Sequence, residues 1–144
     1  MANPRGDQAH LGIDTNVLVA YLDGVHPSHK ETRWLANRAV VLNPTVVHEA
    51  YHTLVFKAKW RGEDASRALL DACSDPRNVF INQTLRTVKA GLELAVRHKL
   101  GGRDALILAS LLGADVREFF TFDRDLLELK KVKFGRSLLA IRPV

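Results

Sequence analysis

The stretch LGIDTNVLVAYL, at residues 11–22, decides the fold of this 144-residue chain. Its apolar start predicts a short buried strand that ends at Asp14, and residues 15–22 then carry apolar side chains at helical spacing. A buried strand that passes directly into a helix is typical of folds in which helices connect parallel strands. We therefore expect the chain to open with a strand-helix unit.

Apolar and amphipathic segments continue to alternate along the chain. Asn43 is a suitable helix cap and Pro44 suits a first turn, so a helix is expected after the second strand. This alternation predicts an α/β fold, with a single domain whose mostly parallel central sheet is flanked by helices on both faces. The further expected elements are an amphipathic stretch around Trp34 and Leu35, strands at 40–42, 79–82, 118–122 and 138–141, and helices at 45–59, 64–73, 84–99 and 104–112.

Length and composition indicate one globular domain at residues 11–143, preceded by a flexible polar tail at residues 1–10. Hydrophobic residues make up 47% of the chain and charged residues 26%, which is ordinary for a folded protein. No apolar run is long enough to span a membrane, and the N-terminal residues lack the apolar core of a signal peptide, so we expect a cytoplasmic protein. The single cysteine, Cys73, cannot form an internal disulfide.

The net charge of +5 favours a polyanionic partner such as nucleic acid. Against this basic background, four acidic residues each adjoin an apolar segment, where a parallel fold would place a strand end or a first helical turn. Carboxylates at one edge of a sheet can converge in space, and such a cluster is unstable without a cation. The pattern therefore predicts a divalent-metal site formed by Asp14, Glu49, Asp104 and Asp123.

Each acid also has a purely structural interpretation. Asp14, Asp104 and Asp123 occupy positions where an aspartate commonly caps a helix or favours its first turn. Glu49 lies inside an expected helix, away from its apolar stripe, where a solvated position would also suit it. Only the joint placement of the four residues favours a shared site.

The chain resembles the PIN-domain ribonucleases, and among them the VapC-type toxins of toxin–antitoxin pairs. The resemblance rests on four motifs in order, IDTNVLVAYL, VVHEA, GGRDALILAS and TFDRDL, and extends over residues 11–143. It implies that Asp14, Glu49, Asp104 and Asp123 bind the metal and that Asn16 and Thr121 orient them, with Asp125 as a further acid. The polar tail is longer than usual for the family, and residues 129–136 are unusually basic for a final loop.

The expected chemistry is metal-dependent hydrolysis of RNA phosphodiester bonds. Mg²⁺ or Mn²⁺ prefers carboxylate oxygens and can activate a water for attack on phosphorus. Arg103 and Arg124 lie next to two of the acids and are candidates for binding the RNA backbone. The resemblance further implies a cognate antitoxin, which would insert into an apolar groove, and a homodimer. The candidate groove residues are Val17, Tyr21, Leu22 and Trp34, or Phe56 and Trp60.

Other functions compete with this interpretation. His48-Glu49-Ala50-Tyr51-His52 satisfies the H-E-x-x-H pattern of zinc proteases, in which Glu49 would be a general base, although a third ligand is missing. Asp14-Thr15-Asn16 partly matches the opening motif of haloacid dehalogenases, but Asn16 replaces its second aspartate. A non-catalytic domain that binds RNA or protein stays open as well.

Overall fold

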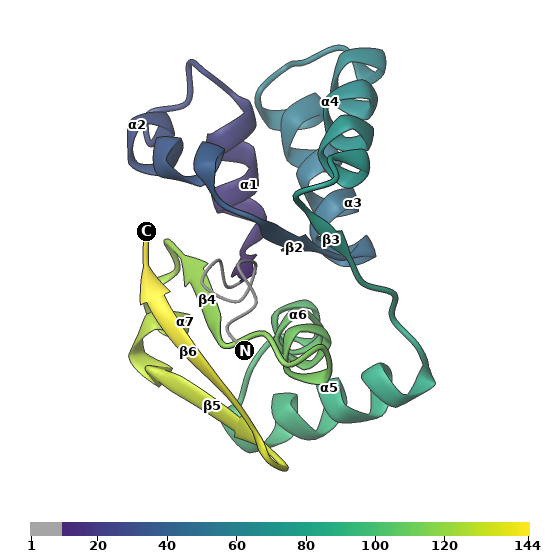
Figure 1. Cartoon of the computed structure of the whole chain (residues 1–144), viewed down its shortest axis with the longest axis vertical. Coiled ribbons are helices and arrows are strands. Elements are labelled where there is room, and N and C mark those ends of the chain that lie inside the picture. The colour runs from purple at the N-terminus through teal and green to yellow at the C-terminus, as the bar shows by residue number, and fades with distance from the viewer. Residues whose placement is uncertain (1–9) are drawn as a thin grey trace, which may run out of the picture.

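The computed structural model describes residues 10–144, so the expected tail falls almost entirely outside the described residues (Figure 1). The six strands are β1 (Leu11–Ile13), β2 (Val40–Leu42), β3 (Val79–Phe80), β4 (Glu118–Thr121), β5 (Lys131–Phe134) and β6 (Ser137–Pro143). The helices are α1 (Thr15–Leu22), α2 (His29–Thr32), α3 (Pro44–His52), α4 (Gly62–Ser74), α5 (Leu85–His98), α6 (Gly102–Gly113) and α7 (Arg124–Leu129).

The strands form one sheet in the order β3-β2-β1-β4-β6-β5, and only the β5–β6 pair is antiparallel. The chain moves from β1 outward to β3 and then crosses back to β4. Because the crossover connections are right-handed, the helices between β1 and β3 lie on one face of the sheet, and the helices between β3 and β4 lie on the opposite face. Figure 1 shows α1 to α4 in the upper half of the view and α5 and α6 in the lower half. The predicted α/β class and mostly parallel sheet are confirmed.

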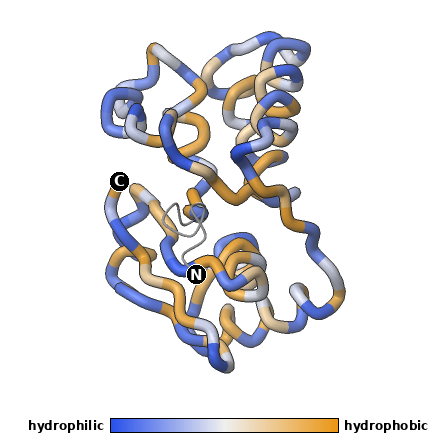
Figure 2. Tube along the Cα trace, in the orientation of Figure 1, coloured by the Kyte–Doolittle hydropathy of each residue, from blue (hydrophilic) through white to orange (hydrophobic). Residues whose placement is uncertain are grey.

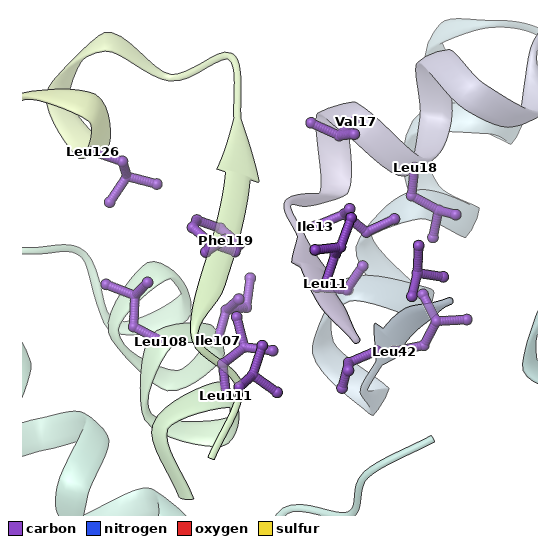
Figure 3. Close-up of a cluster of buried hydrophobic side chains, with 14 of the residues drawn as sticks. Leu11, Ile13, Val17, Leu18, Leu42, Ile107, Leu108, Leu111, Phe119 and Leu126 are labelled. Carbon is purple, nitrogen blue, oxygen red and sulfur yellow. The ribbon is translucent and has the colours of Figure 1, made fainter. Parts of the chain in front are cut away.

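The buried core has two layers, one on each face of the central strands. Leu11 and Ile13 of β1 point toward the face of α1, whereas Gly12 between them points toward α6. A Cβ atom at Gly12 would lie 2.6 Å from Leu111 Cδ1, so the glycine permits α6 to pack closely on β1. Figure 3 shows the side chains of both layers, with Leu111 beside Ile107 in the α6 layer.

Several element boundaries differ from the sequence-based expectation. The expected helix 45–59 is α helical only to His52 and continues as a π-helical turn, Thr53–Lys57. The stretch expected around Trp34 divides into α2 and a 3₁₀ helix, Arg33–Asn37. The third strand includes only Val79 and Phe80.

The interpretation of residues 129–136 as a final loop was wrong. Lys131–Phe134 forms β5, which pairs with β6, and the preceding helix α7 was not expected either. Lysine-rich sequence has low strand propensity, but Val132 is buried and alternates with exposed lysines, as in an edge strand. β6 is also longer than expected because it pairs on both sides, with β4 and with β5.

The helix that carries Glu49 depends on a buried cap. Asn43 is 1% exposed, and its Oδ1 accepts a hydrogen bond from the Val46 backbone N–H at 3.0 Å. We expect Asn43→Ala to lower the free energy of unfolding by roughly 1 to 2 kcal/mol, because a buried N–H would lose its partner. Chemical denaturation measures this loss, and Asn43→Ser, which retains a capping oxygen without burying a charge, is the control. A loss in Asn43→Ala no larger than in the control would show that the cap contributes little.

Candidate metal-binding site

The carboxyl ends of β1 and β4 lie side by side and each delivers an aspartate. Ile13 of β1 pairs with Phe120 of β4, and the Asp14 N–H donates a hydrogen bond to the Phe120 carbonyl at 3.0 Å. Asp14 follows β1 directly, and Asp123 follows Thr121, the last residue of β4, by two positions. This is the edge of a parallel sheet at which ligands usually bind.

A threonine hydroxyl connects the two aspartates. Thr121 Oγ1 donates to Asp14 Oδ2 at 2.8 Å and accepts from the Asp123 N–H at 3.0 Å. Thr121 is fully buried and Asp14 is only 7% exposed, so both groups depend on these contacts to satisfy their polar atoms. The hydroxyl therefore holds one carboxylate in place and fixes the backbone that positions the other.

Asp14 and Asp123 also cap the helices that follow them. Asp14 Oδ1 accepts from the Thr15 N–H at 2.8 Å at the start of α1, and Asp123 Oδ1 accepts from two N–H groups at the start of α7. The capping interpretation is thus correct for both residues. Each cap uses one oxygen. Asp123 Oδ2 has no hydrogen bond with the described residues, whereas Asp14 Oδ2 accepts only one from Thr121.

Glu49 faces this edge from α3, although sequence alone also permitted a solvated position. Thr15 Oγ1 donates to Glu49 Oε2 at 3.4 Å, which connects α3 to the first residue of α1. Glu49 Oε1 is buried and has no hydrogen-bond partner among residues 10–144; Arg103 Nε is the nearby cation, 3.8 Å away. A buried carboxylate oxygen without a partner is costly and suits a group that receives a further ligand.

Asp104 lies in the first turn of α6 but is not its cap, because Gly101 occupies that position. Burial raises the pKa of Asp104 above its ordinary value of 3.8, and the charges of Asp14 and Asp123 raise it further, while Arg103 lowers it. Burial likewise raises the pKa of Asp14, where the Thr121 and Thr15 hydrogen bonds oppose the shift and Asp123 and Glu49 add to it. Asp14 therefore feels the charges of Asp123 and Glu49, and Asp104 feels those of Asp14 and Asp123.

The residues expected to support the site are mostly exposed and form few contacts with the four acids. Asn16 is exposed in the first turn of α1, and its side chain forms no hydrogen bond with the described residues. Asp125 is exposed, and only its backbone N–H reaches Asp123. Arg103 is 79% exposed near Glu49, and Arg124 is exposed at the start of α7. Sequence reasoning missed Thr15, whose only signal was a hydroxyl directly after Asp14.

This donor set fits a hard divalent cation. Carboxylate oxygens are the ligands that Mg²⁺ and Mn²⁺ prefer, and the unpartnered Glu49 Oε1 is one such oxygen. Within residues 10–144, no three carboxylate, imidazole or thiolate groups stand arranged as a complete metal-ligand set. Like-charged carboxylates repel one another unless a cation lies between them, so cation binding would require small movements of these side chains.

The histidines of the H-E-x-x-H pattern do not converge with Glu49. Both are exposed; His48 Nδ1 lies 3.0 Å from the Pro44 carbonyl oxygen, and the His52 ring packs against Phe56 at 4.9 Å between centroids. Glu49 is instead directed toward Thr15. The histidines thus occupy a polar helix face, and the structure does not favour the zinc-protease interpretation.

Acidification gives a direct test of the crowded charges. Because the pKa of Asp104 is raised in the folded chain, the folded state binds this proton more tightly than the unfolded state. Asp104 therefore stabilises the folded state fully at a pH below its pKa in the unfolded chain, and this stabilisation is lost as the pH rises through its pKa in the folded chain. We therefore expect metal-free Asp104→Asn to melt above wild type at pH 7 and the difference to shrink toward pH 4. Melting curves across this range measure it, and a difference independent of pH would contradict the crowding.

The chain matches one family of known proteins. The family model described as PIN domain matches residues 12–132, and the chain belongs to this family. The predicted resemblance is thereby confirmed. No match was found among curated protein sequences.

Solved structures of VapC toxins share the fold. VapC20 of Mycobacterium tuberculosis, a sarcin–ricin loop cleaving toxin, aligns with a TM-score of 0.72 and 19% identity over 86% of this chain and 98% of that one. A toxin–antitoxin complex from Klebsiella pneumoniae aligns with a TM-score of 0.62 and 21% identity over 82% of this chain and 90% of that one. VapBC2 of Rickettsia felis, bound to a promoter DNA fragment, aligns with a TM-score of 0.63 and 16% identity over 92% of this chain and 97% of that one.

Proposed function

We propose that this protein is a divalent-metal-dependent endoribonuclease and the toxin of a toxin–antitoxin pair. The observation that carries the proposal is the set of carboxylates at the β1–β4 edge, in which Thr121 contacts Asp14, Thr15 contacts Glu49 Oε2, and the buried Glu49 Oε1 has no hydrogen-bond partner among residues 10–144. Membership of the PIN domain family and the shared fold with VapC toxins support it.

Asp14, Glu49, Asp104 and Asp123 would hold Mg²⁺ or Mn²⁺, which when bound supplies an activated water and a Lewis acid for phosphodiester hydrolysis. The chain's own contribution is positioning. Thr121 and the Thr15 N–H fix Asp14 in place, and their hydrogen bonds oppose the rise in its pKa that burial causes, since they favour the charged form. Arg103, beside Glu49, would place a positive charge where the RNA phosphate arrives.

The proposal is tested by incubating total cellular RNA with the purified protein in Mg²⁺ or Mn²⁺ and, in parallel, in excess chelator. We expect cleavage only with the metal, and products with 5′-phosphate and 3′-hydroxyl ends. Cleavage that persists in chelator would exclude the proposed chemistry. Metal-dependent cleavage that is lost in zinc alone would further separate this site from a zinc hydrolase.

An antitoxin is the proposed protein partner, and the structure offers one groove for it. A pocket of about 300 Å³ lies between α1, the 3₁₀ helix, β2 and α4, with Tyr21 and Leu22 in its lining. Arg38 and Arg77 also line this pocket, together with two aspartates. A partner helix that carries both apolar and charged side chains would therefore suit the pocket. Val17, a candidate from sequence, is fully buried and belongs to the core.

We also propose a homodimer, formed through α5. Four apolar side chains on this helix are exposed by 43 to 82% and follow one another at spacings of three or four residues. About a two-fold axis near Gly91, an antiparallel second copy would bring these side chains together and set Lys89 opposite Glu93, as a self-complementary interface requires. The exposed stripe consists of Leu85, Val88, Leu92 and Val96.

The described residues contain no helix long and apolar enough to cross a membrane. Because the proposed substrate is cellular RNA, we propose that the protein acts in the cytoplasm.

A further inference from the structure

The β5–β6 end of the sheet has one covered and one uncovered face. Val132 and Leu139 pair with each other and are buried beneath the helices of the α6 side. The alternate positions point to the other face, where α1 to α4 lie over β1 to β3. Lys131 and Lys133 on β5 are exposed, and Leu138 on β6 is 49% exposed. Among the described residues, no helix covers this part of that face.

Positive charge dominates the uncovered face. Lys130 to Arg136, with the sequence KKVKFGR, contains four cations and no acid. Arg117 and Arg136 also line a shallow pocket beside Leu138 and Ala140. Figure 2 shows hydrophilic segments along the β5–β6 hairpin at the lower left of the view. Two acids lie nearby: Glu118 is neutralised by Arg142, which pairs with it at 2.7 Å, whereas Asp115 lines the same pocket and keeps its charge while accepting a hydrogen bond from Ser137 at 3.0 Å.

The basic face is continuous with the carboxylate site. Arg142 of β6 pairs with Phe120 of β4, and the next pair in the ladder contains Thr121, which contacts Asp14. From Arg142 the strand runs back to the hairpin at Arg136, over seven residues or roughly 20 Å. A chain of phosphates that leaves the site along β6 would therefore pass Arg142, which is paired with Glu118, and then meet Lys131, Lys133 and Arg136.

Edge strands often carry lysine simply to prevent pairing with another chain. That role accounts for Lys131 and Lys133, but not for Arg136 in the turn. The unpaired edge is also partly satisfied already, because Arg97 of α5 donates to the Lys133 carbonyl at 3.0 Å. A row of cations along a strand can instead follow the phosphate backbone of a single-stranded nucleic acid.

We propose that the uncovered face of β5 and β6 binds the phosphate backbone of the RNA substrate, chiefly through Lys131, Lys133 and Arg136. The inference rests on the proposed ribonuclease function and extends it, because it assigns a binding surface outside the cleavage site. The surface holds the RNA strand on the side of Arg142 and leaves the carboxylates to act on the phosphodiester that reaches them.

The experiment compares the double variant Lys131→Gln/Lys133→Gln with wild type and with Lys30→Gln/Arg67→Gln, which removes the same charge from exposed positions on α2 and α4. Fluorescence anisotropy in chelator follows binding of a labelled single-stranded RNA of about 16 nucleotides. We expect the β5 variant to bind about tenfold more weakly, with a salt slope smaller by about 1.4 for two lost phosphate contacts. The control should change by less than about twofold, because only non-specific charge is lost.

Cleavage kinetics separate this surface from the active site. On the long RNA the β5 variant should show a raised KM with unchanged kcat, and it should cleave an oligonucleotide of about 4 nucleotides as wild type does. If the wild type cleaves RNA but the β5 variant binds RNA as tightly as wild type does, the proposed binding surface is wrong and the nuclease proposal stands. The same conclusion follows if RNA binding weakens equally in the control variant. Lysine-dependent RNA binding without any wild-type cleavage would support the surface and overturn the nuclease proposal.

Discussion

Asp104→Asn should reduce RNA cleavage by at least about a thousandfold while the protein remains folded. Asparagine has nearly the same shape as aspartate but carries no charge, so it weakens cation binding without leaving a cavity. The half-buried position of Asp104 and its repulsion by Asp14 and Asp123 mean that the substitution also relieves strain in the metal-free protein. Cleavage of total RNA in Mn²⁺, with circular dichroism and melting curves on the same samples, measures both effects.

His48→Ala is the matched control for this experiment. His48 adjoins Glu49 in sequence but is exposed, and its ring nitrogen contacts only the backbone of its own helix among the described residues. We expect this variant to cleave within about threefold of wild type, because a rim side chain contributes little to the chemistry. Activity lost in His48→Ala and kept in Asp104→Asn would reverse the assignment and support the zinc site.

Thr121→Val should weaken both the fold and the activity. Valine retains the volume of threonine but cannot donate to Asp14 Oδ2 or accept from the Asp123 N–H. The buried carboxylate would lose a charge-assisted bond, so we expect the free energy of unfolding to fall by about 2 to 3 kcal/mol. Activity should fall by about 10- to 100-fold, as is usual when a group that orients metal ligands is removed.

Thr121→Ser distinguishes the hydroxyl from the methyl group. Serine keeps both hydrogen bonds and loses one buried methyl, at a cost of about 1 kcal/mol. Denaturant unfolding and Mn²⁺-dependent cleavage should therefore place the serine variant close to wild type and the valine variant well below it. If the two variants lose activity equally, packing at this position matters and the hydroxyl does not.

Much of the fold follows from local pattern. The strand-helix transition at residues 11–22 was predictable because an apolar run ends at a capping aspartate, and Asn43-Pro44 likewise marked the start of α3. α7 and β5 were not predictable in the same way. β5 is held by pairing with β6 and by burial of Val132, which are tertiary effects that outweigh the low strand propensity of lysine.

The site was predictable in part for the same reason. Asp14 and Asp123 follow strands that share an edge, so their proximity is a consequence of parallel topology. The environment of Glu49 could not be inferred, because α3 approaches the edge from one side and its periodicity does not say which neighbour the glutamate meets. Thr15 and Arg103 are those neighbours, and both contacts join residues more than 30 positions apart.

The bond between Thr121 and Asp14 joins residues 107 positions apart. During synthesis the chain emerges from its N-terminus, so β1 and Asp14 are present long before β4. Asp14 can acquire this partner, and Asp123 its place beside it, only after most of the chain has been made. A chain that has not yet reached β4 therefore lacks the assembled carboxylates, and the activity proposed for this protein would arise only after β4 has been made, at the stage when a partner protein could also recognise the folded surface.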